Sequence, residues 1–163
     1  MKDLYIDFDG VIYNSIDVSY KIAEEEDVNK DYESYLQFFK NLDWCTVLEK
    51  SEEINNAFEC IRKIIDSGKF NVFILTHVVS LEEAEYKVKL IKEKIKDITV
   101  IPVPKNLSKS LMVNVKEAIL VDDYPENLRE WKKNGGIGVR FDLDMDGKGF
   151  PVICHLDELI EMF

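Results

Sequence analysis

The chain has 163 residues, which is enough for one domain with a small insert but not for two full cores. Its 32 acidic and 21 basic residues give a net charge of −11. This excess of acid argues against a nucleic acid duplex as a partner, because such a partner needs a basic stripe. A small phosphorylated substrate stays open, since a metal ion and one or two lysines reverse the field locally.

The cysteines and the first residues indicate the compartment. Cys45, Cys60 and Cys154 lie far apart and form no C-x-x-C pair, so we expect free thiols in a reducing cytosol. The chain enters an apolar strand directly after Met-Lys-Asp, which is not typical of a signal peptide. No apolar run approaches the ~20 residues of a membrane span. The sequence therefore predicts a soluble, cytoplasmic protein without a membrane partner.

Two carboxylates follow the first predicted strand, residues 4–6. Asp7 and Asp9 are two residues apart, so their side chains point to the same side if Phe8 faces the core. Two like charges this close repel, and a hard divalent cation with oxygen ligands relieves the repulsion. Gly10 allows the chain to turn away tightly behind the pair. The pattern predicts a Mg²⁺ site, with a solvated acidic turn as the alternative.

The next stretch, residues 14–50, is biased toward helix but irregular, and it is rich in aromatic residues. From Ser51 onward apolar residues recur at helical spacing, and Gly68 is a typical helix stop. The recurring positions are Ile54, Phe58, Ile61, Ile64 and Ile65. We therefore expect an amphipathic helix that leads into the second strand.

Residues 72–75 form a continuous apolar run of the kind that is buried on both faces of a parallel sheet, and Thr76 follows it. Ser80 and Glu83 have the spacing of a capping box, which begins the next helix. The apolar face expected for this helix consists of Leu81, Ala84, Val88, Ile91 and Ile95. A third strand is expected over residues 98–103.

A second acidic pair, Asp122-Asp123, follows the fourth expected strand, residues 118–121. Alone this pair is typical of a helix-capping turn. Together with Asp7 and Asp9 it would crowd four carboxylates onto neighbouring strand ends, and a metal ion between them makes that arrangement stable. The two pairs therefore predict one metal site.

The last third of the chain continues the alternation. Pro125 begins a helix that Gly135-Gly136 ends, and a fifth strand (137–141) and a short closing helix (155–162) follow. The order of elements predicts an α/β fold, a Rossmann-like parallel sheet of about five strands flanked by helices. Ligands of such sheets bind at the carboxyl edge, where polar residues follow three of these strands.

These motifs resemble the four-motif series of haloacid dehalogenase-like hydrolases. The series here consists of Asp7-Phe8-Asp9-Gly10-Val11, Thr76, a lysine and Asp122-Asp123, in family order. Residues 122–127 and the small size are most similar to the 5'(3')-deoxyribonucleotidase branch, although that branch usually carries arginine where this chain has Tyr124. The resemblance implies a core domain of residues 1–13 and 51–163, with a small helical cap (14–50) inserted after the first motif.

The resemblance also implies roles for the motif residues. Asp7 would attack the phosphorus and form an aspartyl-phosphate, and Asp9 would protonate the leaving alcohol and then activate water. Thr76 and a lysine would hold the phosphoryl oxygens. Mg²⁺ would be bound by Asp7 and by the main-chain carbonyl of Asp9. In the second pair, Asp123 would be the direct ligand and Asp122 would lie behind it.

Three assignments keep two alternatives each. The active-site lysine is Lys105 or Lys109, of which Lys109 fits the nucleotidase spacing better. His77 either contacts the substrate or packs beside the site. The cap aromatics, with Trp44 as the candidate substrate contact, either stack on a base or form the core of the cap.

The predicted function is Mg²⁺-dependent hydrolysis of a phosphomonoester through an aspartyl-phosphate, with a (deoxy)nucleoside monophosphate as the favoured substrate. A phosphatase or phosphomutase for another small metabolite would use the same residues, and a non-catalytic phosphate- or metal-binding regulator is the alternative without enzymatic activity. Carbon–halogen hydrolysis on the same fold is a further alternative. It needs no acid at the position of Asp9, so the presence of Asp9 argues against it. Residues 142–147 copy the first half of an EF-hand loop, but its twelfth position is Ile153 where glutamate is required, so we reject calcium binding there.

Overall fold

The structure, a computed structural model that describes residues 1–163, is built on one sheet of six parallel strands. The strands are β1 (Lys2–Ile6), β2 (Phe70–Val78), β3 (Thr99–Pro104), β4 (Ile119–Asp122), β5 (Ile137–Phe141) and β6 (Val152–Ile153). Their order in the sheet is β3-β2-β1-β4-β5-β6. The predicted parallel α/β fold is confirmed. The sixth strand was not predicted, because two residues carry no readable pattern.

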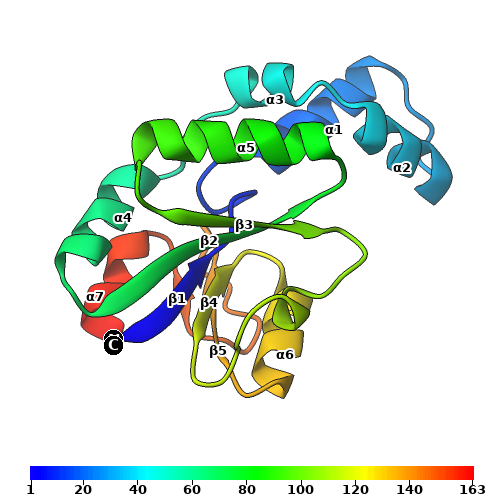
Figure 1. Ribbon diagram of the computed structural model, residues 1–163. Coiled ribbons are helices and arrows are strands. Elements are labelled where there is room, and N and C mark those ends of the chain that lie inside the picture. The colour runs from blue at the N-terminus through cyan, green and yellow to red at the C-terminus, as the bar shows by residue number, and fades with distance from the viewer.

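Helices cover both faces of the sheet (Figure 1). The helices of the core are α4 (Ala57–Asp66), α5 (Leu81–Lys94), α6 (Pro125–Lys133) and α7 (Leu159–Met162), with the 3₁₀ turns η1 (Lys109–Leu111) and η2 (Leu156–Glu158). Successive residues of β1 point to opposite faces: Leu4 and Ile6 pack in the larger apolar cluster, and Tyr5 packs against Trp131 of α6. Full burial of a side chain such as Leu4 contributes about 1.5–3 kcal/mol.

Two predicted boundaries are wrong. The helix expected from Ser51 begins at Ala57, because Asn55 and Asn56 adopt positive φ angles of 45° and 53° that interrupt a helix. The second strand does not end before Thr76 but continues to Val78, since β3 offers pairing partners for these residues. The predicted helix stop at Gly68 is confirmed by its φ angle of 67°.

Three helices lie between β1 and α4 in the chain, and we call them the cap helices: α1 (Ser15–Glu25), α2 (Tyr32–Asn41) and α3 (Trp44–Lys50). They have an apolar cluster of their own, which consists of Val18, Leu42, Trp44 and Val47. In Figure 1 they lie beyond the end of the sheet, with α3 next to α5. The division into a core and a cap domain of residues 14–50 stays a prediction.

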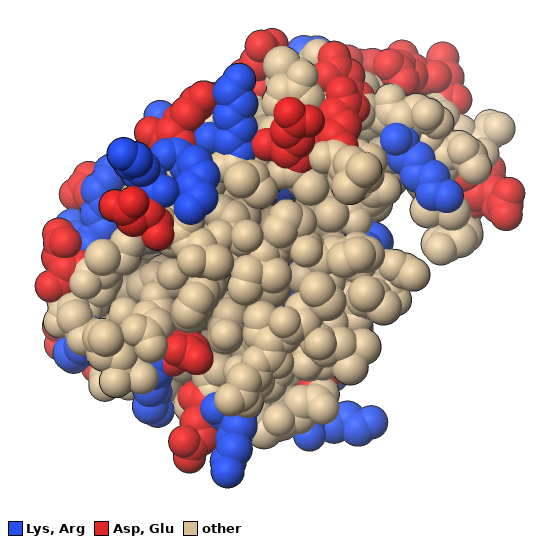
Figure 2. All heavy atoms as spheres, viewed as in Figure 1, with Lys and Arg blue, Asp and Glu red and all other residues tan.

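Four smaller expectations from the sequence concern the surface charge, the cysteines, membrane spans and the loop at 142–147. Figure 2 shows acidic and basic side chains along the upper edge of this view and an uncharged middle, with no continuous basic stripe on this face. The three cysteines are free thiols, as predicted. The longest helix, α5, has 14 residues, and none of the helices combines the length and apolar character that a membrane crossing requires. Ile153 is buried in β6, so the loop at 142–147 has no ligand at its twelfth position.

Candidate active site

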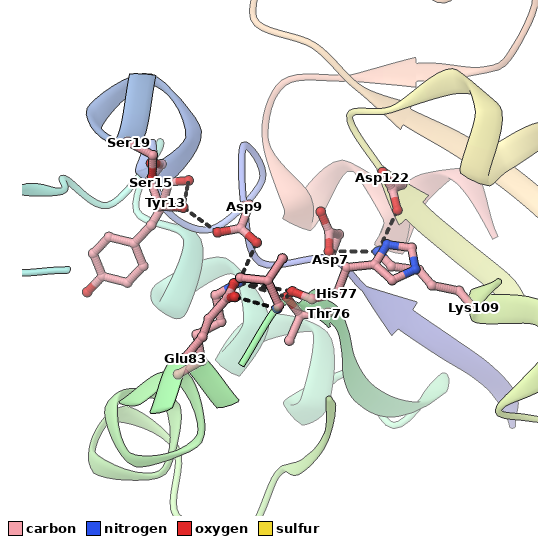
Figure 3. A network of polar contacts seen from close by, with 12 residues as sticks. Asp7, Asp9, Tyr13, Ser15, Ser19, Thr76, His77, Glu83, Lys109 and Asp122 are labelled. Carbon is pink, nitrogen blue, oxygen red and sulfur yellow. Dashed lines mark hydrogen bonds and ion pairs between the residues drawn. The ribbon is translucent and has the colours of Figure 1, made fainter. Parts of the chain in front are cut away.

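Neighbouring strands bring the two acidic motifs together. The register pairs Ile6 of β1 with Val121 of β4, so Asp7 and Asp122 follow at adjacent strand ends. Between them lies Lys109 of η1, whose Nζ donates to Oδ1 of Asp7 at 2.7 Å and to Oδ2 of Asp122 at 2.6 Å (Figure 3). The Lys109 side chain is only 2% exposed. Of the two candidate lysines, Lys109 therefore lies at the acids, whereas Lys105 is exposed on the wall of the neighbouring cavity.

The two residues of the second acidic pair differ in their contacts. Asp122 is fully buried, and its oxygens accept hydrogen bonds from Lys109, from the Asn127 side chain and from the Tyr124 backbone. The Asp123 carboxylate accepts no hydrogen bond in the structure. This carboxylate is therefore free for a metal ion, and the role of Asp123 as the direct ligand stays a prediction.

Gly10 makes room for the Asp123 carboxylate. Its φ angle is 78°, and a Cβ atom at this position would lie 2.3 Å from Oδ2 of Asp123. Any other residue here would be strained and would push the carboxylate out of the site. The glycine of the first motif is therefore needed to leave space for the carboxylate of the second motif.

The residues present fit a divalent cation. Oxygen atoms of Asp7, Asp122 and Asp123 all lie within 4.8 Å of one another. Lys109 pairs with Asp7 and Asp122 but not with Asp123, so three neighbouring carboxylates have one ammonium group among them, which leaves an excess of negative charge. Carboxylate oxygens are the ligands that Mg²⁺ prefers in proteins.

The same charge excess changes the acidity of the site. Burial raises the pKa of Asp123 to about 8 and that of Asp7 to about 7, from an ordinary value of 3.8. Neighbouring carboxylates push both pKa values in the same direction, while Lys109 opposes the shift. Burial works to lower the pKa of Lys109, but Asp122 and Asp7 outweigh it, so this pKa is raised and the ammonium stays charged.

Removal of divalent metal is expected to make the protein less stable at alkaline pH. The folded state of the metal-free protein binds protons at Asp7 and Asp123 more tightly than the unfolded chain does. Its free energy of unfolding therefore falls as the pH rises from about 4 to about 8. Mg²⁺ at a hundred times its Kd should add about 2.7 kcal/mol. Thermal unfolding at pH 6 and pH 8, in EDTA and in Mg²⁺, measures both effects.

Variants separate the ligands in this experiment. Asp123→Asn should lose most of the stabilisation by Mg²⁺, and Asp122→Asn less of it. Asp66→Asn, an exposed change on α4, should keep the full gain. Melting curves that do not respond to saturating Mg²⁺ would contradict the site, and equal effects of the two site variants would reassign the direct ligand.

Asp9 belongs to a second polar network beside the first (Figure 3). Its Oδ1 accepts a hydrogen bond from Ser15 Oγ at 2.6 Å, and its Oδ2 accepts one from Lys87 Nζ at 2.5 Å. Lys87 also donates to Oε1 of Glu83 at 2.6 Å. Burial works to lower the pKa of Lys87, but Asp9 and Glu83 outweigh it and raise this pKa.

Three residues of this network, Ser15, Glu83 and Lys87, were not predicted from the sequence to belong to the site. Glu83 and Lys87 have the spacing of an ordinary surface ion pair on a helix, so the pattern favours solvent. The predicted apolar face of α5 is wrong at its first residue, since Leu81 is 90% exposed. The Ser80 hydroxyl accepts from the Glu83 backbone as a capping box requires, but the Glu83 carboxylate accepts from the Val79 backbone and from Lys87 instead of the Ser80 backbone.

Thr76 and His77 lie on β2 at different depths. Thr76 is fully buried, and its hydroxyl lies 3.4 Å from Lys87 Nζ. The His77 ring lies on the cavity wall, and its Nε2 is 2.8 Å from the Leu107 carbonyl oxygen. Burial lowers the pKa of His77, so the ring is neutral near pH 7. The structure thus brings both residues to the acids, but only His77 faces the open space.

A cavity of about 600 Å³ opens above the acids, between the cap helices and the core. Its walls are formed by Asp7, Asp9, Ile16, Ser19, Tyr20, Phe39, Trp44, His77, Val79, Glu83, Lys105, Asp122, Asp123, Tyr124 and Asn127. Trp44 is 5% exposed and packs in the cap cluster, whereas Tyr20 is 47% exposed. Figure 2 shows the surface indented on the right, below the cap helices.

Several solved structures with a similar fold are hydrolases. A HAD-superfamily hydrolase of subfamily IA, variant 1, from Geobacter sulfurreducens is similar with a TM-score of 0.68 at 14% identity, over 100% of both chains. A HAD phosphatase from Thermococcus onnurineus is similar with a TM-score of 0.66 at 20% identity, over 99% of this chain and 97% of its own. The chain has the fold of haloacid dehalogenase (HAD) superfamily hydrolases.

One further similar structure carries ligands. It is a D,D-heptose 1.7-bisphosphate phosphatase from B. bronchiseptica complexed with magnesium and phosphate, with a TM-score of 0.57 at 14% identity, over 99% of this chain and 97% of its own. No protein-family profile matches the sequence, and no curated protein is similar to it. The expected resemblance is thus confirmed for the superfamily fold, and the deoxyribonucleotidase branch stays a prediction.

Proposed function

We propose that the protein is a Mg²⁺-dependent phosphomonoesterase that acts through a phosphorylated Asp7. The observation that carries this proposal is the placement of one carboxylate, Asp7, beside a buried lysine and two further acids at the floor of a cavity. Such a group can attack a phosphoryl centre, because the Lys109 ammonium, and Mg²⁺ when bound, would reduce the repulsion between two anions. The phosphatases among the similar structures support the same reading.

The two oxygens of Asp7 have different partners. Oδ1 accepts from Lys109, and Oδ2 accepts no hydrogen bond in the structure, so Oδ2 is the attacking atom. The bond from Oδ2 to phosphorus forms while the bond from phosphorus to the leaving oxygen breaks, and Asp9 gives that oxygen a proton. Asp9 then takes a proton from the water that releases phosphate. Lys109 keeps Asp7 and Asp122 in place throughout.

Metal binding completes the proposal. Asp7, the main-chain carbonyl of Asp9 and Asp123 would hold Mg²⁺, with Asp122 behind them. When bound, the ion supplies positive charge for the phosphoryl oxygens, which is the main contribution that phosphoryl transfer needs.

Hydrolysis of p-nitrophenyl phosphate tests the activity itself. We expect release of p-nitrophenol with Mg²⁺ and none in EDTA. A trapped phosphoryl group on Asp7, detected by mass spectrometry after rapid quenching, would identify the nucleophile. Binding of phosphate and Mg²⁺ without turnover of any ester would instead favour the non-catalytic regulator.

The substrate we propose is a (deoxy)nucleoside monophosphate. The cavity volume of about 600 Å³ is in the range of small-molecule sites. Tyr20, Phe39 and Trp44 from the cap helices give its upper wall an aromatic surface. Stacking of a base on such a surface contributes about 1–3 kcal/mol.

Nucleoside monophosphates are therefore expected to have a higher kcat/KM than hexose phosphates of equal charge. Trp44→Ala and Tyr20→Ala should each reduce this preference by about ten- to a hundredfold, because each removes a ring from the cavity wall. Tyr32→Ala changes an exposed tyrosine of the cap helices outside the cavity and serves as the matched control. Kinetics on one nucleotide and one hexose phosphate are compared for each variant. An equal loss on both substrates would mean that the ring only supports the cap.

A further inference from the structure

Three side chains that can ligate a metal ion converge after β6, outside the group of acids at the proposed active site. Cys154 and His155 directly follow β6, and Glu158 ends the 3₁₀ turn η2. One donor atom of each residue, a sulfur, a ring nitrogen and a carboxylate oxygen, lies within 4.8 Å of the other two. Cys154 is half-buried and the other two residues are exposed, so an ion can reach them from solvent.

The closest pair of donor atoms has nearly the separation that a zinc site requires. Sγ of Cys154 lies 3.3 Å from Nδ1 of His155. Zn–S and Zn–N bonds of about 2.3 and 2.0 Å at a tetrahedral angle place the two atoms about 3.5 Å apart. These two ligands therefore need little rearrangement to hold an ion. Glu158 can approach the same ion by rotation, because its side chain lies in solvent.

Backbone hydrogen bonds hold the Glu158 carboxylate at this place. Its Oε1 accepts from the backbone N–H of Cys154 at 3.0 Å and from that of His155 at 2.7 Å. Asn55, which precedes α4, donates its side-chain amide to the Cys154 carbonyl oxygen at 2.7 Å. Oε2 of Glu158 accepts no hydrogen bond, and no lysine or arginine pairs with this carboxylate. The turn therefore presents a negative charge that has no cation of its own.

The contacts do not match a nucleophilic cysteine. In such a site a third group orients the imidazole that takes the thiol proton. Here Glu158 binds the backbone instead of the His155 ring. Thiolate, imidazole and carboxylate are the three common ligand types of Zn²⁺, whereas Mg²⁺ prefers oxygen alone. The donor set thus differs in kind from the three carboxylates at the proposed active site.

We propose that Cys154, His155 and Glu158 form a second metal site, selective for Zn²⁺ over Mg²⁺. The ion replaces the thiol proton, which passes to water, and is bound by Sγ, Nδ1 and a carboxylate oxygen with water in the fourth position. η2, in the closing segment drawn red in Figure 1, packs against α4. Zinc fixes the turn that joins the last strand to this segment. The site does not depend on the proposed phosphatase reaction.

Co²⁺ is the probe for this site, because a thiolate ligand gives Co²⁺ a strong charge-transfer absorption in the near ultraviolet. The full chain, reduced and freed of metal, is titrated with Co²⁺ in excess Mg²⁺, which competes for the acidic site. We expect the absorption to saturate at one Co²⁺ per chain and to disappear when Zn²⁺ is added. The three acids at the proposed active site offer no sulfur, so they cannot produce this signal.

Variants assign the signal to the residues. Cys154→Ser should lose the absorption. His155→Ala should weaken Co²⁺ binding at least about tenfold, the loss that even an indirect partner of a metal causes. Cys45→Ser is the matched control and should keep the absorption, because Cys45 is also half-buried and lies 3.6 Å from Glu49 but has no histidine beside it.

Thermal melting without metal checks that each variant is folded. Absence of the absorption in the wild type, or its persistence in Cys154→Ser, would overturn the site. If Cys154→Ser does not fold, His155→Ala decides, and an unchanged affinity for Co²⁺ in that variant would overturn the proposal.

Discussion

Asp7→Asn is expected to abolish hydrolysis of every phosphate ester while the protein stays folded. The amide has nearly the same shape as the carboxylate but is no nucleophile, so kcat should fall by at least about 10⁴-fold, as for other nucleophile variants. The measurements are the initial rate with p-nitrophenyl phosphate and the circular dichroism spectrum. Asp66→Asn, with its side chain in solvent on α4, is the matched control and should keep full activity.

The outcome also tests the chemistry. No phosphoryl group should be trapped on the Asp7→Asn protein. A variant with unchanged kcat would exclude Asp7 as the nucleophile, and a variant that traps phosphate on another residue would move the assignment to that residue.

Lys109→Met is expected to affect both stability and activity. The methionine fills the space but leaves the Asp7 and Asp122 carboxylates buried without their ion pair, and breaking a buried pair in this way costs about 3–5 kcal/mol. Loss of a preorganised charge at the reacting group should lower kcat by about 10²–10³-fold. Urea unfolding in EDTA measures the first effect, and p-nitrophenyl phosphate kinetics with Mg²⁺ measure the second.

Lys105→Met is the informative comparison, because Lys105 was the other candidate. Its side chain lies exposed on the cavity wall, so the free energy of unfolding should change by less than about 0.5 kcal/mol. If Lys105→Met instead causes the larger loss of kcat, the roles of the two lysines are reversed.

The acids at the strand ends were accessible from the sequence because strand patterns are short and local. An apolar run that is followed by Asp7 or Asp122 predicts both a strand and the edge of the sheet at which the carboxylate lies. The sheet then brings distant residues together by a rule that holds for all parallel folds. The sequence left two candidates for the active-site lysine, Lys105 and Lys109. The structure shows that Lys109 is the one that reaches the acids.

The network around Asp9 was not accessible in this way. A buried Glu83–Lys87 pair and an exposed one have the same spacing, and only the three-dimensional contacts tell them apart. Leu81 shows the reverse case, since an apolar residue at helical spacing lies in solvent at the start of α5. A helical pattern shows which residues share a face of the helix. Whether charged residues can be buried on that face depends on the groups that pack against it.

The position of β1 in the sheet has a consequence for the order of folding. β1 is synthesised long before both of its neighbours in the sheet, since Leu4 pairs with Val72 and Ile119. Contacts this distant in sequence make folding slow. A nascent chain that ends before β4 leaves one edge of β1 unpaired, and such edges pair with other chains. Asp7 and Lys109 are 102 residues apart, so the ion pair between them forms only after the chain has been synthesised beyond Lys109, and products truncated before that point are expected to aggregate.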